Sequence, residues 1–221
     1  MPRKPPRRTR ERIVETALVL FNRDGEPHVT TAHIADEMNI SPGNLYYHFR
    51  NKEEIVGELH AAFERAVLPL LALPENRSPG IEDLWLLLHL LFERMWAHRF
   101  LYRDLDDITS RHPAIGQGIA ALHQRLRGLI VAICEALRAD GILHADDRAI
   151  DALATNVVVV ATCWMSFQRV LSRGPGARAA PGDDPSAMHF ERAAAQVLAL
   201  IAPFLRERER AHLERLSEQY L

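Results

Sequence analysis

The stretch VTTAHIADEMNISPGNLYYHFRNKEEI, residues 29–55, decides the fold. It holds two short helical segments, 31–38 and 42–48, which are separated by a turn and followed by a longer helix beginning near Lys52. Short helices joined in this way are typical of a helix-turn-helix unit. Its apolar residues have the spacing needed to close a three-helix core, which we expect to contain Val29, Ile34, Ala35, Met38, Ile40, Leu45, Phe49 and Ile55.

Polar and small residues of the same stretch fall outside this core. Ser41 is suited to cap the second short helix and Pro42 to begin it, so the start of that helix can face the major groove of DNA. Gly43 allows close approach to base edges, where Asn44 can both donate and accept hydrogen bonds. Hydroxyl, imidazole and ammonium groups are donors for phosphate oxygens. The candidate DNA surface therefore consists of Thr31, Pro42, Gly43, Asn44, Tyr47, His48 and Lys52, with Tyr46 expected to be partly buried.

Basic residues are concentrated at the N-terminus, although the formal net charge is −2. Glu11 is the single acid among the first twelve residues. Such an arm either neutralises phosphates or is a solvated tail. Its basic residues are Arg3, Lys4, Arg7, Arg8, Arg10 and Arg12.

Composition favours a compact, soluble protein, because 48% hydrophobic and 25% charged residues match globular proteins. Cys134 and Cys163 lie in apolar helical patterns without metal-ligand spacing, so we expect both in the core and neither a metal nor a cofactor. The most apolar run, residues 157–165, is shorter than the ~20 residues that cross a bilayer. We therefore expect a cytoplasmic protein without a membrane segment.

The remaining sequence predicts an all-α fold of about nine helices, because no stretch alternates in the manner of a strand pair. Thr9 is the expected cap of the first helix, and residues 174–186 read as an irregular linker. We divide the chain into a DNA-binding domain, residues 1–58, and a larger helical domain, residues 59–221. The expected helices span residues 9–22, 31–38, 42–48, 52–69, 81–98, 101–110, 113–139, 146–173 and 187–209.

The segment SPGNLYYHFRNKEEI, preceded by TTAHIADEMNI, closely resembles the DNA-binding unit of the TetR (tetracycline-repressor) family. The resemblance implies a homodimeric, ligand-responsive repressor that reads a pseudo-palindromic operator. It assigns phosphate contacts to Thr31, Tyr47, His48 and Lys52, and either phosphate contact or a core position to Tyr46. Pro42, Gly43 and Asn44 would lie at base edges. Pro42 departs from members that have a polar or basic side chain there, which leaves the operator sequence open.

The C-terminal helices of this family form a dimer interface and a cavity for a small-molecule effector. Here the last two long helices are the expected interface, with ordinary core helices as the alternative. Aromatic and histidine residues at helical spacing are candidates for the cavity or for plain core. They are Trp85, His89, Phe92, Trp96, Phe100, Tyr102 and His123.

Two other classes of function compete with this interpretation. An enzyme is suggested by Asp104, Asp106 and Asp107 near His112, but no nucleophile elbow, phosphate loop or HExxH motif is present and we assign no catalytic residue. The second alternative is a helix-turn-helix that binds a protein. Its binding would be insensitive to salt, whereas DNA binding weakens steeply as salt rises.

Overall fold

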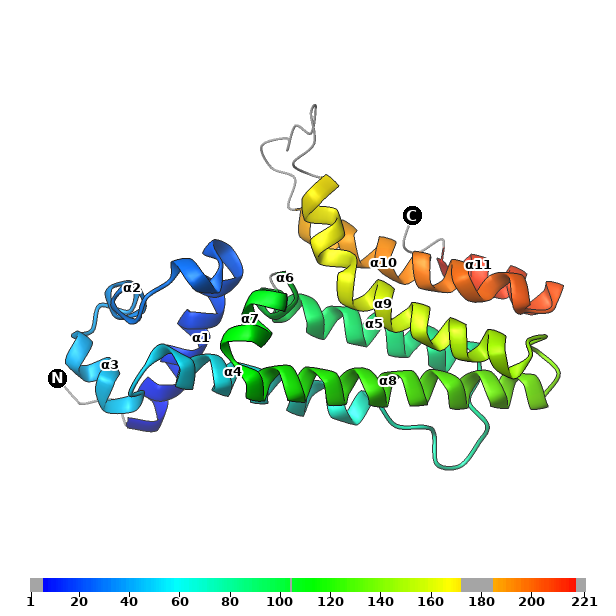
Figure 1. Cartoon of the computed structure of the whole chain (residues 1–221), viewed down its shortest axis with the longest axis horizontal. Coiled ribbons are helices and arrows are strands. Elements are labelled where there is room, and N and C mark those ends of the chain that lie inside the picture. Colours follow the sequence, from blue (N-terminus) through cyan, green and yellow to red (C-terminus); the bar gives the residue numbers. More distant parts are fainter. Residues whose placement is uncertain (1–5, 104, 172–184, 218–221) are drawn as a thin grey trace. The chain divides into compact units, whose positions relative to one another are not determined.

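The computed structural model describes residues 6–103, 105–171 and 185–217, with side chains described for 8–103, 105–171 and 192–216. Within these residues the chain forms eleven α-helices and three short 3-10 turns, and no strand (Figure 1). The chain divides into two compact units. The first contains the residues up to Arg65 together with His98–Gly116, and the second contains Ala66–Ala97 and the residues from Gln117 onward.

The first unit is built around the helix-turn-helix predicted from the sequence. Its helices are α1 (Pro6–Asp24), α2 (Thr31–Glu37), α3 (Pro42–His48), most of α4 (Lys52–Val67), α6 (Phe100–Arg103) and α7 (Leu105–Arg111). The predicted core residues are buried, except Ile40, which is half-buried. Phe21, Phe49 and Phe63 are the largest fully buried side chains that α1, the α3–α4 turn and α4 contribute to this core. The all-α prediction is thus confirmed, and its core is nearly the predicted one.

Local capping explains where α2 and α3 begin. The Thr30 hydroxyl accepts a hydrogen bond from the His33 backbone N–H, and the His33 ring accepts one from the Thr30 backbone N–H. The Ser41 hydroxyl accepts a hydrogen bond from the Asn44 backbone N–H at 3.2 Å, as predicted. Between the helices, Asn39 adopts a φ of 53°, a left-handed conformation that asparagine tolerates better than most residues. These contacts hold the two helices at a tight turn.

The second unit is a bundle of longer helices (Figure 1). α10 packs against both α9 and α5, and α11 contacts α10 and α5. Gly141 lies just after the end of α8 with a φ of 65°, which suits glycine, and the Asp146 carboxylate caps α9 by accepting from the Ala149 backbone N–H at 2.8 Å. The helices are α5 (Ile81–Ala97), α8 (Pro113–Ala139), α9 (Asp147–Leu171), α10 (Pro185–Ile201) and α11 (Glu207–Ser217).

Several details differ from the prediction. α1 begins at Pro6 rather than after a Thr9 cap, because proline is compatible with the first helical turn. The single helix expected at 101–110 is two short helices, α6 and α7. The helix expected at 187–209 ends at Ile201 because Pro203 interrupts it, and α11 follows as an additional helix. Arg3, Lys4 and most of the expected linker 174–186 lie outside the described residues, as does the side chain of Arg7.

We expected both cysteines in the core, but only one of them is buried. Cys134 is buried as predicted, and burial raises the pKa of its thiol to about 11. Cys163 is exposed, so its predicted core position is wrong. Its helical neighbours Val159, Phe167 and Val170 are 52%, 52% and 70% exposed. The apolar pattern of α9 therefore continues onto a face that the single chain leaves uncovered.

By length and composition alone, the α9 helix could span a membrane, and only 28% of its most apolar 18-residue window is buried. We call the face formed by Val159, Cys163, Phe167 and Val170 the α9 stripe. These positions are spaced by 4, 4 and 3 residues, which places them on one side of a helix.

Candidate nucleic-acid interface and effector-binding surfaces

A concave surface of about 260 Å³ lies where α2, α3 and the start of α4 meet. The hydroxyl oxygens of Thr31 and Tyr46 are 3.0 Å apart at this surface, and either can be the donor. We predicted that Tyr46 is partly buried. It is 51% exposed, so about half of its surface is covered. We call this surface the polar hollow; it is lined by Thr30, Thr31, Tyr46, Arg50, Asn51 and Lys52.

The α3 helix presents the remaining predicted DNA contacts to solvent. Pro42, Gly43 and Asn44 are exposed, and Tyr47 is 78% exposed with its ring edge-on to His48 at a centroid distance of 5.1 Å. Among the described residues, no heavy atom outside the neighbouring backbone lies within 4 Å of the position that a Cβ on Gly43 would occupy. This glycine is therefore not required by packing within the chain. The open space in front of it is available to another molecule.

Lys52 is more tightly held than its predicted role suggested. Its ammonium group donates to the backbone carbonyls of Glu26 at 3.0 Å and Val29 at 3.1 Å, and lies 2.9 Å from Oε1 of Glu26. The lysine side chain is only 20% exposed. It thus ties α4 to the 3-10 turn Glu26–His28, in addition to lining the polar hollow. Contact between Lys52 and a phosphate remains a prediction.

Glu26 is a fully buried carboxylate placed between two cations. Gly25 precedes it with a φ of 90°, which turns the chain so that Glu26 points inward. Its second oxygen, Oε2, accepts from Nη2 of Arg111, which also donates to Asp107 at 2.6 Å. Burial alone would raise the pKa of Glu26, but the hydrogen bonds from Arg111 and Lys52 outweigh burial and hold this pKa below its ordinary value. Glu26 is therefore charged at neutral pH.

The segment 98–111 belongs to the same unit through buried contacts. The Phe100 backbone N–H donates to Oδ1 of Asn22 at 3.1 Å, and the Phe100 ring lies 5.4 Å from that of Phe21. The Tyr102 ring packs edge-on against Phe63 at 5.7 Å, and burial raises the pKa of Tyr102. Phe100 and Tyr102, both predicted for an effector cavity, thus lie within the core of the first unit.

The other predicted cavity residues lie on α5 and α8 of the second unit. The Trp85 and His89 rings stack at 5.5 Å, and Phe92 is buried. His123 forms a 3.2 Å hydrogen bond with the Thr162 hydroxyl, and burial lowers the pKa of this histidine. Trp96 is half-buried. Membership of a cavity remains a prediction for all of them.

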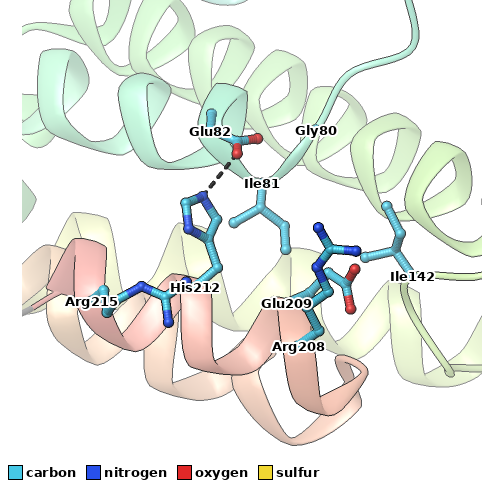
Figure 2. Close-up of a pocket in the computed structure, with 8 residues that line it drawn as sticks. All are labelled: Gly80, Ile81, Glu82, Ile142, Arg208, Glu209, His212 and Arg215. Atoms are coloured by element: carbon cyan, nitrogen blue, oxygen red, sulfur yellow. Dashed lines mark hydrogen bonds and ion pairs between the residues drawn. The ribbon is translucent and has the colours of Figure 1, made fainter.

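Two hollows of the second unit involve other residues. The first, of about 440 Å³, lies between α11 and the start of α5; Figure 2 shows His212 pointing at Glu82, with Arg208 and Glu209 near Ile142. His212 Nε2 is 2.8 Å from Oε1 of Glu82. The second, of about 410 Å³, is more apolar and runs along α5 and α8; its lining includes Leu70, Leu73, Leu86, Leu87, Leu90, Leu129 and Ile133. Both volumes suit a small molecule.

Sequence reasoning missed four residues that shape the first unit. Arg50 and Asn51 line the polar hollow, and their position immediately before Lys52 was the available signal. Glu26 and Arg111 are 85 residues apart, and no local pattern joins them. Asp107, considered for a catalytic or metal cluster, is bound to Arg111. Among the described residues, no three histidine, cysteine or acidic side chains are grouped so that they could hold a metal ion.

Comparison with known proteins assigns the chain to a family. Residues 13–59 match the family "Bacterial regulatory proteins, tetR family", and residues 62–213, more than half of the chain, match the TetR family described as "Bacterial transcriptional repressor". The chain belongs to the TetR family. Its two matched regions meet close to the boundary that we predicted at residue 58, which remains a prediction because the first compact unit also takes in residues 98–116.

Curated TetR-family relatives match parts of the chain. The regulator TcmR of Streptomyces glaucescens is 34% identical over 74 residues, 33% of each protein. An HTH-type transcriptional regulator of Saccharopolyspora erythraea is 27% identical over 158 residues, 71% of this chain and 61% of the relative. The chain thus spans about a third of the length of TcmR and about three-fifths of the length of the Saccharopolyspora erythraea regulator.

Solved structures extend the similarity over the whole fold. A TetR-family transcriptional regulator from Marinobacter aquaeolei VT8 is 33% identical with a TM-score of 0.83, covering 96% of this chain and 98% of that protein. A SmeT–triclosan complex shares the fold at 17% identity, with a TM-score of 0.62 and coverage of 91% and 94%. The helical second unit is therefore a TetR-type fold and not only an extension of the helix-turn-helix.

Proposed function

We propose that this TetR-family chain is a sequence-specific transcriptional repressor, which binds a pseudo-palindromic operator as a homodimer and releases it when a small molecule binds. The observation that carries the proposal is the exposed α3 helix beside the polar hollow. Donors that suit phosphates surround a helix whose glycine has open space in front of it. Binding to chromosomal DNA would place the protein in the cytoplasm.

The DNA contacts divide into two kinds. We assign base edges to Pro42, Gly43 and Asn44, because they are exposed at the start of α3. We assign phosphate contacts to hydroxyl, imidazole and cationic groups around them, because these contacts fix register without reading sequence. The second group consists of Thr31, Tyr46, Tyr47, His48 and Lys52, to which the polar hollow adds Arg50.

The α9 stripe supports a homodimer. Val159, Phe167 and Val170 are more than half exposed on one face of a helix that packs on its other side against α10. Apolar side chains gathered in this manner mark an interaction site. We assign this face to a second copy of the chain, since two helix-turn-helix units are needed to read both halves of an operator. A lipid surface is the competing occupant.

The second unit supplies the place for an effector. We propose a predominantly apolar molecule, because the hollow along α5 and α8 is lined mostly by apolar residues, with leucines forming half of the lining, and has a volume suited to small ligands. The aromatic and histidine residues predicted for the cavity, Trp85, His89, Phe92, Trp96 and His123, lie on the same two helices. An effector bound there would favour the conformation that releases DNA.

The experiment is selection of bound duplexes from random DNA, followed by affinity measurement at several salt concentrations. We expect a pseudo-palindromic site and a steep loss of affinity with salt. Arg50→Gln should reduce the slope of log affinity against log salt concentration by about one for each phosphate contact that a subunit loses. Arg210→Gln, which removes an exposed arginine from α11, is the matched control and should leave the slope unchanged. Binding to no duplex at low salt would refute the proposal.

A further inference from the structure

The two oxygens of the buried Glu26 carboxylate serve two different helices. Oε1 is 2.9 Å from the ammonium of Lys52 at the start of α4, whereas Oε2 accepts from Arg111 at the end of α7. The carboxylate itself has no exposed surface. A buried charge of this kind requires compensation by cations or hydrogen bonds, because an unpaired charge in the interior is strongly destabilising. Glu26 is therefore shared between a cation that lines the polar hollow, Lys52, and one that does not, Arg111.

The ammonium of Lys52 lies among three oxygens in this arrangement. An ammonium group carries three N–H donors. Two of them are donated to the Glu26 and Val29 carbonyls, and the ammonium also forms an ion pair with Oε1 of Glu26 at 2.9 Å. Lys52 nevertheless lines the polar hollow beside Thr31 and Tyr46. A phosphate in the polar hollow would therefore compete with the Glu26 carboxylate for the charge of this ammonium.

Arg111 determines how unfavourable it is for Lys52 to leave the Glu26 carboxylate. While Arg111 holds Oε2, a departing Lys52 leaves Glu26 with a cation still in place. If Arg111 is withdrawn, Lys52 becomes the one remaining cation on Glu26 among the described residues, and the lysine is held more firmly. The position of Arg111 is itself fixed by Asp107, one helical turn earlier in α7.

We propose that Arg111 is a positioning residue for DNA binding, which acts through Glu26 to make the Lys52 ammonium available to an operator phosphate. The inference rests on the proposed function and names a route by which α7 regulates it. A displacement of α7 that withdraws Arg111 returns Lys52 to Glu26 and weakens DNA binding. By reciprocity, a phosphate that draws Lys52 away tightens the Arg111–Glu26 pair.

The test uses the full chain and the duplex selected above, with affinity measured as a function of salt. R111Q is expected to bind roughly tenfold more weakly than wild type at moderate salt and to lose about one unit of slope per subunit, as K52Q does. R111Q added to K52Q should cause no further loss. R111K retains a cation and should restore the slope, and R127Q, which breaks an Arg–Asp pair of the second unit, is the control.

Glu26 provides the decisive comparison. In an E26Q background, R111Q should leave affinity and slope unchanged, because no buried charge then holds Lys52. E26Q alone should keep at least the wild-type slope, so it carries the test even if R111Q does not fold. A wild-type slope in R111Q, or an equal loss from R111Q in both backgrounds, would overturn the inference. Wild-type protein that binds no duplex would instead overturn the proposed function.

Discussion

The hydroxyl oxygens of Thr31 and Tyr46 lie 3.0 Å apart and join the first residue of α2 to α3. Both side chains line the polar hollow, so the pair presents two hydroxyl groups at one edge of the candidate DNA surface. One hydroxyl of the pair donates its hydrogen to the other and keeps only its lone pairs for further contacts. The hydroxyl that accepts this hydrogen bond keeps its own hydrogen, which remains available to a phosphate. The pair therefore orients a donor before DNA arrives.

Tyr46→Phe is accordingly expected to weaken operator binding by about tenfold to a hundredfold, because a hydrogen bond to a charged group contributes about 1.5–3 kcal/mol. Stability should change by less than about 1 kcal/mol, since the hydroxyl pair is exposed to water. Operator affinity and thermal unfolding measure the two effects. If the Tyr46→Phe variant bound the operator with undiminished affinity, the Thr31–Tyr46 pair would not contact DNA.

Gly43→Ala separates folding from DNA binding. In the part of the chain that the structure describes, no atom obstructs a Cβ at this helical position, so the substitution should stabilise the protein by up to about 0.5–1 kcal/mol. Affinity for the operator should fall at least tenfold, because the added methyl group would keep α3 away from base edges. Gly128→Ala in α8, which is equally unobstructed, is the matched control and should leave affinity unchanged. Equal affinities of the two variants would contradict our placement of α3.

The Glu26 carboxylate predicts a specific dependence of stability on pH. Its folded-state pKa lies below the ordinary value of 4.5, so folding favours the charged form. The resulting stabilisation is complete above about pH 4.5 and is lost as the pH falls through the lowered pKa. Glu26→Gln should reduce the free energy of unfolding by roughly 1–3 kcal/mol at neutral pH, and the difference should shrink in acid.

Urea unfolding from pH 7 to pH 3 measures this difference. Glu82→Gln removes an exposed carboxylate of the second unit and serves as the control, for which a much flatter difference is expected. A Glu26→Gln difference that stays constant across this range would exclude the carboxylate charge as its source.

The α9 stripe predicts a dimer that one substitution disrupts. Phe167→Glu should convert the protein to a monomer in sedimentation velocity, because it places a charge on a face that we assign to the second copy. Val19→Glu alters an equally exposed apolar residue of α1 and should remain dimeric. Cys163 should react faster with a thiol reagent in the Phe167→Glu monomer than in the dimer. A wild-type monomer, or one that partitions onto lipid vesicles, would refute this assignment.

Local patterns predicted the helix-turn-helix well. Ser41 and Pro42 fix the start of α3 by capping and by restricted φ, and both effects depend on adjacent residues alone. The buried positions Leu45, Phe49 and Ile55 likewise follow from spacing. The Asp146 cap of α9 and the turn at Gly141 also involve only neighbouring residues. Features set within one or two helical turns were thus available from the sequence.

Long-range relationships were not available in this way. The charge of Glu26 is balanced by Arg111, and nothing near either residue signals the other. Lys52 was predicted to contact a phosphate, but its carbonyl acceptors were not foreseen because they belong to a turn more than twenty residues earlier. The periodicity of α9 was recognised, but it does not distinguish burial within one chain from burial between chains, so Cys163 was placed in the core.

The position of α6 and α7 has a consequence for how this protein can be divided or recombined. Phe100, Tyr102 and Arg111 complete the core and the charge balance of a unit whose remaining helices end some forty residues earlier. A fragment cut after α4, at Val67, would expose Phe21 and Phe63 to water and leave Glu26 with a missing partner. Chimeric regulators that exchange sensory halves between relatives should therefore transfer residues 98–116 with the N-terminal half.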